Sequence, residues 1–236
     1  MAGDRQDSAG PKVAADVAAF AYLDGAMQVL LVRRKYEPYE SYWSLPGGGI
    51  LPDETLEQAA ERHLLEEAGV QDVFMEQLAT FSEFARDPRG RVISCCYLAL
   101  VDARRVTLRP GSDRREAAWR PLEPLLAEIE GGPVLAFDHD TILRYARRRL
   151  AYKLEYQNVA WSMLPETFTL SELRRVYEAG IGRAFEPNNF RRIALGWGVL
   201  AESGERPTGG RPAATYRFAD TRPLILAQSA RYRRSG

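Results

Sequence analysis

The pattern of apolar and polar positions predicts a β-hairpin close to the start of the chain. Residues 13–22 form a run rich in small and β-favouring side chains, and residues 27–32 form a compact apolar run. Between them lies Leu23-Asp24-Gly25-Ala26, and Asp-Gly between two such runs is a strong hairpin signal. A third strand-like run covers residues 92–101. The first part of the chain is therefore expected to contain a sheet.

One long helix is predicted beside these strands. Residues 44–53 contain three consecutive glycines and two prolines, which is typical of a loop. Residues 54–68 predict a helix, which Gly69 ends. Strands mixed with a long helix are typical of an α/β or α+β domain, and we expect this domain to end near residue 135.

The pattern becomes helical after residue 133. Apolar side chains recur there at spacings of four, seven and three and predict one helical stripe, formed by Leu150, Leu154, Trp161 and Leu164. Pro165 stops this helix, because the residue before a proline disfavours helical backbone.

The residues that follow predict a winged helix-turn-helix. A second helix is expected to open at a capping box, Thr169-Leu170-Ser171-Glu172, and a third near Pro187. The core-facing positions of the third helix are Phe190, Ile193, Ala194 and Trp197. Residues 199–200 and 215–218 then pair as a hairpin. Three short helices followed by a hairpin make up the winged helix unit, and its third helix would be the recognition helix.

Side chains on the outer face of this unit are candidates for DNA contacts. Arginine can fork onto guanine and asparagine can pair with adenine, while helix amino ends and a basic wing loop can meet phosphates. The predicted DNA contacts are Thr169, Ser171, Asn188, Asn189, Arg191, Arg192, Arg206 and Arg211. Two alternatives stay open: winged helices also serve as protein–protein modules, and arginine-rich helix faces are often only solvated.

Composition limits the class of protein. The chain has 236 residues, of which 45% are hydrophobic and 27% charged, which is typical of a folded protein with two modest domains. No apolar run approaches the roughly 18 residues needed to span a bilayer, and the start has no apolar stretch for a signal peptide. Cys95 and Cys96 are neighbours and are not placed for an ordinary disulfide. We therefore expect a cytoplasmic protein with no membrane partner.

The net charge of zero conceals two opposite halves. Residues 1–143 contain 15 Lys or Arg against 24 Asp or Glu, a net charge of −9, and residues 144–236 contain 17 against 8, a net charge of +9. The acidic half would repel nucleic acid, whereas the basic half could attract it. Charge alone is equally consistent with a charged surface that has no nucleic-acid partner.

A motif of fixed spacing lies in the first half. Gly48 is followed after five residues by Glu54, and after seven more by Arg-His-Leu-Leu-Glu-Glu-Ala-Gly-Val at 62–70. This segment resembles the Nudix box, whose pattern is G-x5-E-x7-R-E-U-x-E-E-x-G-U with U an aliphatic residue. The one departure is His63, where the box has glutamate. The resemblance implies an α/β class, with a Nudix-like α/β/α sandwich around a mixed sheet.

The departure bears on the chemistry, because positions 63, 66 and 67 share one helix face. In a working Nudix hydrolase this face holds carboxylates that collect Mg²⁺, bind a diphosphate and activate water. Imidazole is a poor ligand for Mg²⁺, so we expect no catalytic residue and at most weak metal binding by Glu66 and Glu67. Two alternatives remain: His63 has no consequence, or a carboxylate elsewhere, such as Glu83, serves as general base.

A domain that has lost its catalytic activity can keep its ligand pocket. Residues 81–94 resemble a segment of Nudix enzymes that act on ADP-ribose. Arginines there could hold a diphosphate, and aromatic side chains could stack on adenine. The predicted effector-binding residues are Arg33, Trp43, Gly48, Phe84 and Arg86.

The combination of a defective Nudix box with a winged helix resembles the NrtR family, the Nudix-related transcription regulators of NAD metabolism. Further segments that resemble this family are Phe-Asp-His-Asp at 137–140, Lys-Leu-Glu-Tyr at 153–156, Phe-Thr-Leu-Ser-Glu-Leu at 168–173, Asn-Phe-Arg-Arg at 189–192 and Gly-Gly-Arg-Pro-Ala at 209–213. The resemblance implies a homodimeric repressor that binds a palindromic operator. It implies ADP-ribose or a related NAD metabolite as effector, with no required cofactor.

Two other functions are open at this point. The chain could be an active Nudix hydrolase of the ADP-ribose pyrophosphatase type with an accessory C-terminal domain, or a ligand-gated protein-interaction module. For the regulator we expect five parts: a disordered tail at 1–12, a Nudix-like effector domain at 13–137, linker helices at 138–164, a winged helix at 165–222 and a tail at 223–236.

Overall fold

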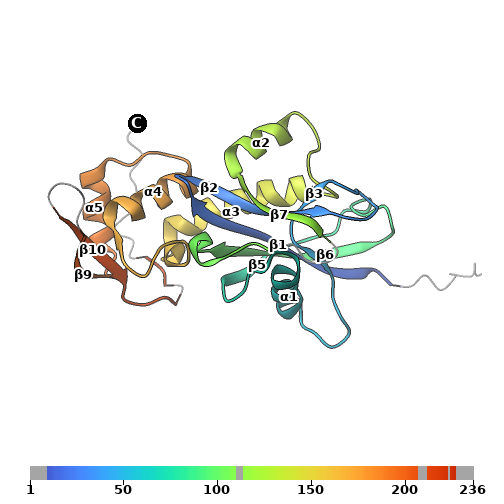
Figure 1. The fold of residues 1–236 in the computed structure, drawn as a ribbon, viewed down its shortest axis with the longest axis horizontal. Helices are drawn as coiled ribbons and strands as arrows, with labels where there is room; N and C mark the ends of the chain where they lie inside the picture. Colours follow the sequence, from blue (N-terminus) through green and yellow to red (C-terminus); the bar gives the residue numbers. More distant parts are fainter. Residues whose placement is uncertain (1–9, 110–113, 207–211, 223, 227–236) are drawn as a thin grey trace, which may run out of the picture.

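The first part of the chain forms a mixed sheet, seen on the right of Figure 1. The computed structural model describes residues 10–109, 114–206, 212–222 and 224–226. The strands follow the order β3-β2-β1-β6-β5, with β4 paired to β1 and β7 paired to β2. Their bounds are β1 Lys12–Leu23, β2 Ala26–Arg34, β3 Trp43–Ser44, β4 Gly47–Gly49, β5 Phe74–Phe81, β6 Val92–Val101 and β7 Arg114–Pro121.

The predicted hairpin and the predicted third strand are both present. Asp24 and Gly25 turn the chain between β1 and β2 with positive φ angles of 52° and 83°, which is the backbone that an Asp-Gly turn favours. Strand β6 runs parallel to β1, whereas the other described pairings of this sheet are antiparallel. The expectation of a mixed sheet is confirmed.

Helices cover both faces of this sheet. Helix α1 (Leu56–Ala68) packs on one face against small buried residues of β1, among them Ala15 and Ala19. Helix α3 (His139–Tyr156) packs on the other face, and α2 (Leu122–Glu130) lies beside it. The α/β/α class is therefore confirmed, and the predicted linker at 138–164 supplies one of its helical layers.

Local sequence explains the ends of α1. Thr55 caps its first turn and accepts a hydrogen bond from the Gln58 amide, while the Gln58 side chain accepts one from the Thr55 amide. Gly69 ends it with a φ of 73°, a left-handed conformation that favours glycine. This helix fixes the spacing of the motif at 62–70.

One expectation for the second part was wrong. Helix α3 ends at Tyr156, because Gln157 adopts an extended backbone with φ −128° and ψ 150°. A short 3₁₀ helix, η2, follows at Val159–Met163. Leu150 and Leu154 therefore belong to α3, whereas Trp161 and Leu164 do not continue its stripe. Spacing alone missed the break, because Leu164 beyond it is buried and Trp161 is partly buried against the same core.

The winged helix forms as predicted, at the left of Figure 1. Helices α4 (Leu170–Ile181) and α5 (Pro187–Gly196) precede the hairpin of β9 (Leu200–Arg206) and β10 (Ala213–Phe218), and β8 (Phe168–Thr169) completes the sheet β8-β10-β9. The predicted core-facing residues of α5 are all buried. Tyr177 of α4 stacks on Trp197 with ring centroids 5.1 Å apart.

The remaining expectations concern the ends and connections of the chain. Residues 1–9 of the predicted first tail, and 223 and 227–236 of the second, lie outside the described residues, while Lys12 already begins β1. Cys95 and Cys96 are both free thiols on β6. In a search of the described ranges, no helix is long and apolar enough to cross a membrane.

A single apolar core joins the two parts. Leu150 and Leu154 of α3 belong to the same buried cluster as Phe20 of the sheet and Tyr177 of α4. Gly180 of α4 lies so close to Leu154 that a Cβ atom there would collide with it. The two parts therefore share one buried core.

We expect Leu154→Ala to lower the free energy of unfolding of the whole chain by about 2–5 kcal/mol, because it opens a cavity in a fully buried site. Leu195→Ala, at a half-exposed position of α5, should change it by less than about 0.5 kcal/mol. Calorimetry together with tryptophan fluorescence measures both. One transition that shifts as a unit is expected, and two transitions of which only one shifts would contradict a shared core.

Candidate ligand cavity and nucleic-acid interface

A cavity of about 1100 Å³ opens where the Nudix-type helix, the glycine loop and the start of α3 meet. Gly47 and Gly48 form part of its wall, and a Cβ on Gly48 would lie 2.8 Å from the His63 ring. Glycine at that position therefore lets the loop pass over the helix. Phe137 and His139 bring the beginning of α3 into the same wall.

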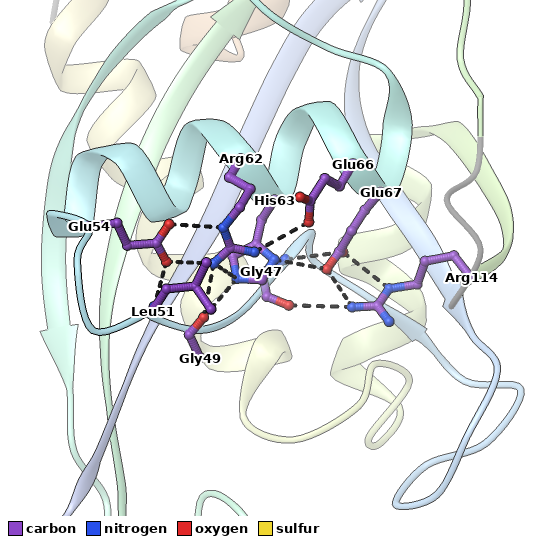
Figure 2. Close-up of polar contacts among 9 residues, drawn as sticks. All are labelled: Gly47, Gly49, Leu51, Glu54, Arg62, His63, Glu66, Glu67 and Arg114. Carbon is purple, nitrogen blue, oxygen red and sulfur yellow. Dashed lines mark hydrogen bonds and ion pairs between the residues drawn. The ribbon is translucent and has the colours of Figure 1, made fainter.

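Protein groups surround the carboxylate of Glu67, the last glutamate of the box (Figure 2). Its side chain is only 3% exposed. Arg114 of β7 donates to both carboxylate oxygens, from Nη2 at 2.5 Å and from Nε at 3.1 Å. The Gly47 amide donates to Oε2 at 3.2 Å, and His63 Nδ1 lies 3.2 Å from Oε1. A carboxylate offers about four lone-pair directions, and protein groups take all of them here.

His63 is buried and faces two acceptors. Its Nδ1 lies beside Glu67, and its Nε2 is 3.2 Å from the Gly49 carbonyl oxygen. Burial lowers the pKa of His63, but the hydrogen bond and charge of Glu67 outweigh it, so the pKa is raised above its usual value. Arg62 Nη2 lies 3.4 Å from His63 Nε2, and the positive charge of Arg62 lowers the pKa of His63. The residue that replaces the box glutamate thus adds positive character.

Arg62 holds the start of the motif together. It donates from Nε and Nη2 to the two oxygens of Glu54, at 2.9 and 2.6 Å. These hydrogen bonds lower the pKa of Glu54 to about 2. Arg62 also reaches Glu66 at 3.3 Å, and Glu66 is the exposed carboxylate of the face.

The box residues do not fit a divalent cation. A hard cation needs several oxygen ligands, and the face offers one exposed carboxylate, one carboxylate that is already paired, and a histidine. Over the described ranges, no group of three or more His, Cys, Asp or Glu side chains could hold a metal ion. Weak metal binding by Glu66 and Glu67 stays a prediction, and Glu66 is the exposed member of the pair.

A second buried network connects the cavity to α3. Arg86 donates to both oxygens of Asp138, at 3.0 and 2.7 Å, and to Asp16 at 3.4 Å. Asp138 is the residue that precedes α3. His139 Nδ1 accepts a hydrogen bond from the Leu45 amide, and burial lowers the pKa of His139, which favours its neutral ring.

The cavity includes only part of the predicted effector set. Gly48 and Arg86 line it, whereas Arg33, Trp43 and Phe84 do not. Arg33 and Trp43 are register partners on β2 and β3 and share the face opposite to Arg34, because neighbours on a strand alternate. Phe84 is 86% exposed, with Arg91 over its ring. The effector role of these three stays a prediction for residues that lie outside this cavity.

Three residues outside the predicted effector set also line the cavity, and one of them, Arg89, belongs to the segment 81–94 whose arginines were expected to hold a diphosphate. Arg34 and Arg89 lie over the Phe137 ring, at 4.7 and 5.5 Å from its centroid. Phe137 has a positive φ of 57°, which nothing in a single sequence signals for a phenylalanine. Strand alternation would have favoured Arg34 over Arg33 once the register of β2 was known.

The predicted recognition helix, α5, presents its predicted contact residues to solvent. The side chains of Asn188, Asn189, Arg191 and Arg192 on α5 are exposed. Glu186 caps this helix and accepts hydrogen bonds from the Asn188 and Asn189 amides at 3.0 and 2.6 Å. A carboxylate therefore occupies the amino end where we expected a phosphate, and that expectation is not supported for α5.

The other predicted DNA contacts lie around the start of α4. Ser171 is exposed, while Thr169 caps α4 and exchanges hydrogen bonds with Glu172. Arg206 of the wing donates to Glu172 at 2.8 Å and to the Thr167 carbonyl oxygen at 2.9 Å. Arg211 lies outside the described residues. The wing is thus tied to α4 by an ion pair.

Known proteins match both parts of the chain. A family model described as the NUDIX domain matches residues 13–136, and one described as the NrtR DNA-binding winged helix domain matches residues 160–218. The chain is 35% identical to the ADPR responsive transcriptional repressor NtrR of Acinetobacter baylyi over 91% of this chain and 85% of that protein.

Solved structures give the same result. Shewanella oneidensis NrtR complexed with a 27mer DNA has a TM-score of 0.74 and 35% identity, over 87% of this chain and 93% of that chain. The NUDIX domain of the same protein complexed with ADP ribose has a TM-score of 0.54 and 34% identity, over 63% and 94%. The chain therefore belongs to the NrtR family, with a NUDIX domain followed by an NrtR DNA-binding winged helix domain.

Proposed function

We propose that this protein is a transcriptional repressor of NAD metabolism genes whose NUDIX domain senses ADP-ribose or a closely related metabolite. One observation carries the proposal: α3 begins in the wall of the ligand cavity and ends packed against α4 of the winged helix. A ligand in the cavity thus touches the helix that supports the DNA-binding part. The relatives complexed with DNA and with ADP ribose support the two ligands.

The competing function is hydrolysis of ADP-ribose. The chain keeps a NUDIX domain, but its box has lost one carboxylate and pairs another with Arg114. A hydrolase of this class needs that face to bind metal and activate water. We therefore propose that ADP-ribose binds and leaves unchanged.

The effector is expected to act on the Arg86–Asp138 ion pair. Arg86 lines the cavity, is only 4% exposed, and is shared between Asp138 and Asp16. A diphosphate competes well for a guanidinium because it accepts two charge-assisted hydrogen bonds. When Arg86 turns toward the effector, Asp138 loses its partner at the start of α3.

Helix α3 then carries the change to the DNA-binding part. Arg147 of α3 donates to the Gly180 carbonyl oxygen of α4 at 2.7 Å, and Leu154 packs at the same crossing. A shift of α3 therefore moves α4 and the recognition helix behind it. The effect on DNA affinity is limited by the difference in effector affinity between the two arrangements, typically about 5–150-fold.

We place the operator contacts on α5 and the wing. Two copies of this chain would read a palindromic operator, with half-sites one helical turn apart. The homodimer, the palindrome and the cytoplasmic location that a chromosomal regulator requires all belong to this proposal. The proposed regulator requires no metal.

The test is fluorescence anisotropy of the full chain on a duplex selected from genomic fragments, titrated with ADP-ribose in Mg²⁺. We expect specific binding that ADP-ribose weakens by about 5–150-fold, while chromatography recovers the ADP-ribose intact. Arg191→Ala should weaken DNA binding, and Arg105→Ala, at an exposed position of the NUDIX domain, should not. Rapid loss of ADP-ribose without specific DNA binding would favour the hydrolase.

The ion pair gives a second prediction, for Asp138→Asn. The neutral amide cannot hold the Arg86 guanidinium, so the variant should resemble the effector-bound state. We expect tighter ADP-ribose binding and weaker DNA binding, each by about tenfold. Glu128→Gln, at a half-exposed carboxylate of α2, serves as control and should change neither affinity. Unchanged affinities in Asp138→Asn would remove this ion pair from the mechanism.

A further inference from the structure

Arg114 occupies a place where a hydrolase of this fold would need a cation. Its guanidinium spans both oxygens of Glu67, and its side chain is 10% exposed. Nη2 also lies 3.4 Å from the Gly47 carbonyl oxygen, so the arginine is fixed against the glycine loop as well as the helix.

The pairing changes the charge that a ligand meets. Glu67 would otherwise present a buried negative charge to a diphosphate, at a high cost in repulsion and desolvation. The fixed guanidinium cancels that charge permanently, whereas a metal would do so only when bound. Arg34, Arg89 and Arg91 line the same cavity, so cationic side chains outnumber carboxylates around it without any metal.

The geometry also explains why a metal would have to displace protein groups. A cation on Glu67 would have to break the two Arg114 hydrogen bonds and the one from the Gly47 amide. Releasing Arg114 would leave a buried guanidinium without its carboxylate, which is strongly unfavourable. The arginine and the divalent cation therefore exclude one another at this carboxylate.

We propose that Arg114 replaces the divalent cation of the NUDIX site, so that a ligand with a diphosphate group binds in this cavity without metal and depends on the Arg114 charge. The identity of that ligand as ADP-ribose rests on the function proposed above. The replacement of the cation rests only on the contacts of Glu67. The two claims can fail separately.

The first test uses Mn²⁺ alone, detected by electron paramagnetic resonance with the full chain. Wild type should bind no Mn²⁺ at micromolar concentration, and Arg114→Gln should gain binding because Glu67 is released. Arg120→Gln is the matched control, since it lies on the same strand outside the cavity. Micromolar Mn²⁺ binding by wild type would overturn the inference, whatever ADP-ribose does.

The second test measures ADP-ribose and inorganic pyrophosphate affinity by calorimetry, in EDTA and in Mg²⁺. Wild type should bind equally in both, and Arg114→Gln should bind about 10- to 100-fold more weakly in EDTA. Mg²⁺ should restore part of the affinity of that variant. Binding by wild type that EDTA abolishes, or full affinity of Arg114→Gln in EDTA, would overturn the inference. Binding of pyrophosphate but not ADP-ribose would leave it standing and contradict the proposed effector.

Discussion

The packing of helix α3 between the NUDIX sheet and helix α4 is the contact on which the rest of the structure depends. Its buried leucines belong to one core with the sheet and with the aromatic centre of the winged helix. Because interiors are densely packed, such a helix responds to strain by moving between discrete arrangements rather than by deforming gradually. The cavity begins where this helix begins, and the winged helix packs on its other end.

At the Nudix box, groups that would bind a cation are replaced by or paired with positively charged or neutral side chains. The box keeps its glycine, its Arg62–Glu54 pair and its two last glutamates, and Arg62 and Glu67 hold the glycine loop through the Gly49 carbonyl oxygen and the Gly47 amide. It loses the parts that would gather a cation, because His63 replaces a carboxylate and Arg114 pairs with Glu67. In the proposed account, arginines that suit a diphosphate line the cavity, while the face that would gather a cation carries a histidine and a paired carboxylate, which suits a sensor.

The sequence predicted the architecture well because its signals were local. An Asp-Gly turn, a capping box at Thr169 and a fixed-spacing box each act within a few residues, and the structure forms them where expected. Only Gly48 and Arg86 of the predicted effector residues line the cavity, since which arginine of a neighbouring pair faces it depends on strand register. The partner of Glu67 is 47 residues away in the chain, so no local pattern could reveal Arg114. The same holds for Arg86 and Asp138, which are 52 residues apart.

The central claim is that cavity and recognition helix are coupled through α3, and reciprocity of binding tests it most directly. The affinity for ADP-ribose should be measured by calorimetry on the free protein and on the protein saturated with operator DNA. The account predicts weaker binding to the DNA complex, by the same factor by which ADP-ribose weakens DNA binding. Equal affinity for the free and the DNA-bound protein would contradict it.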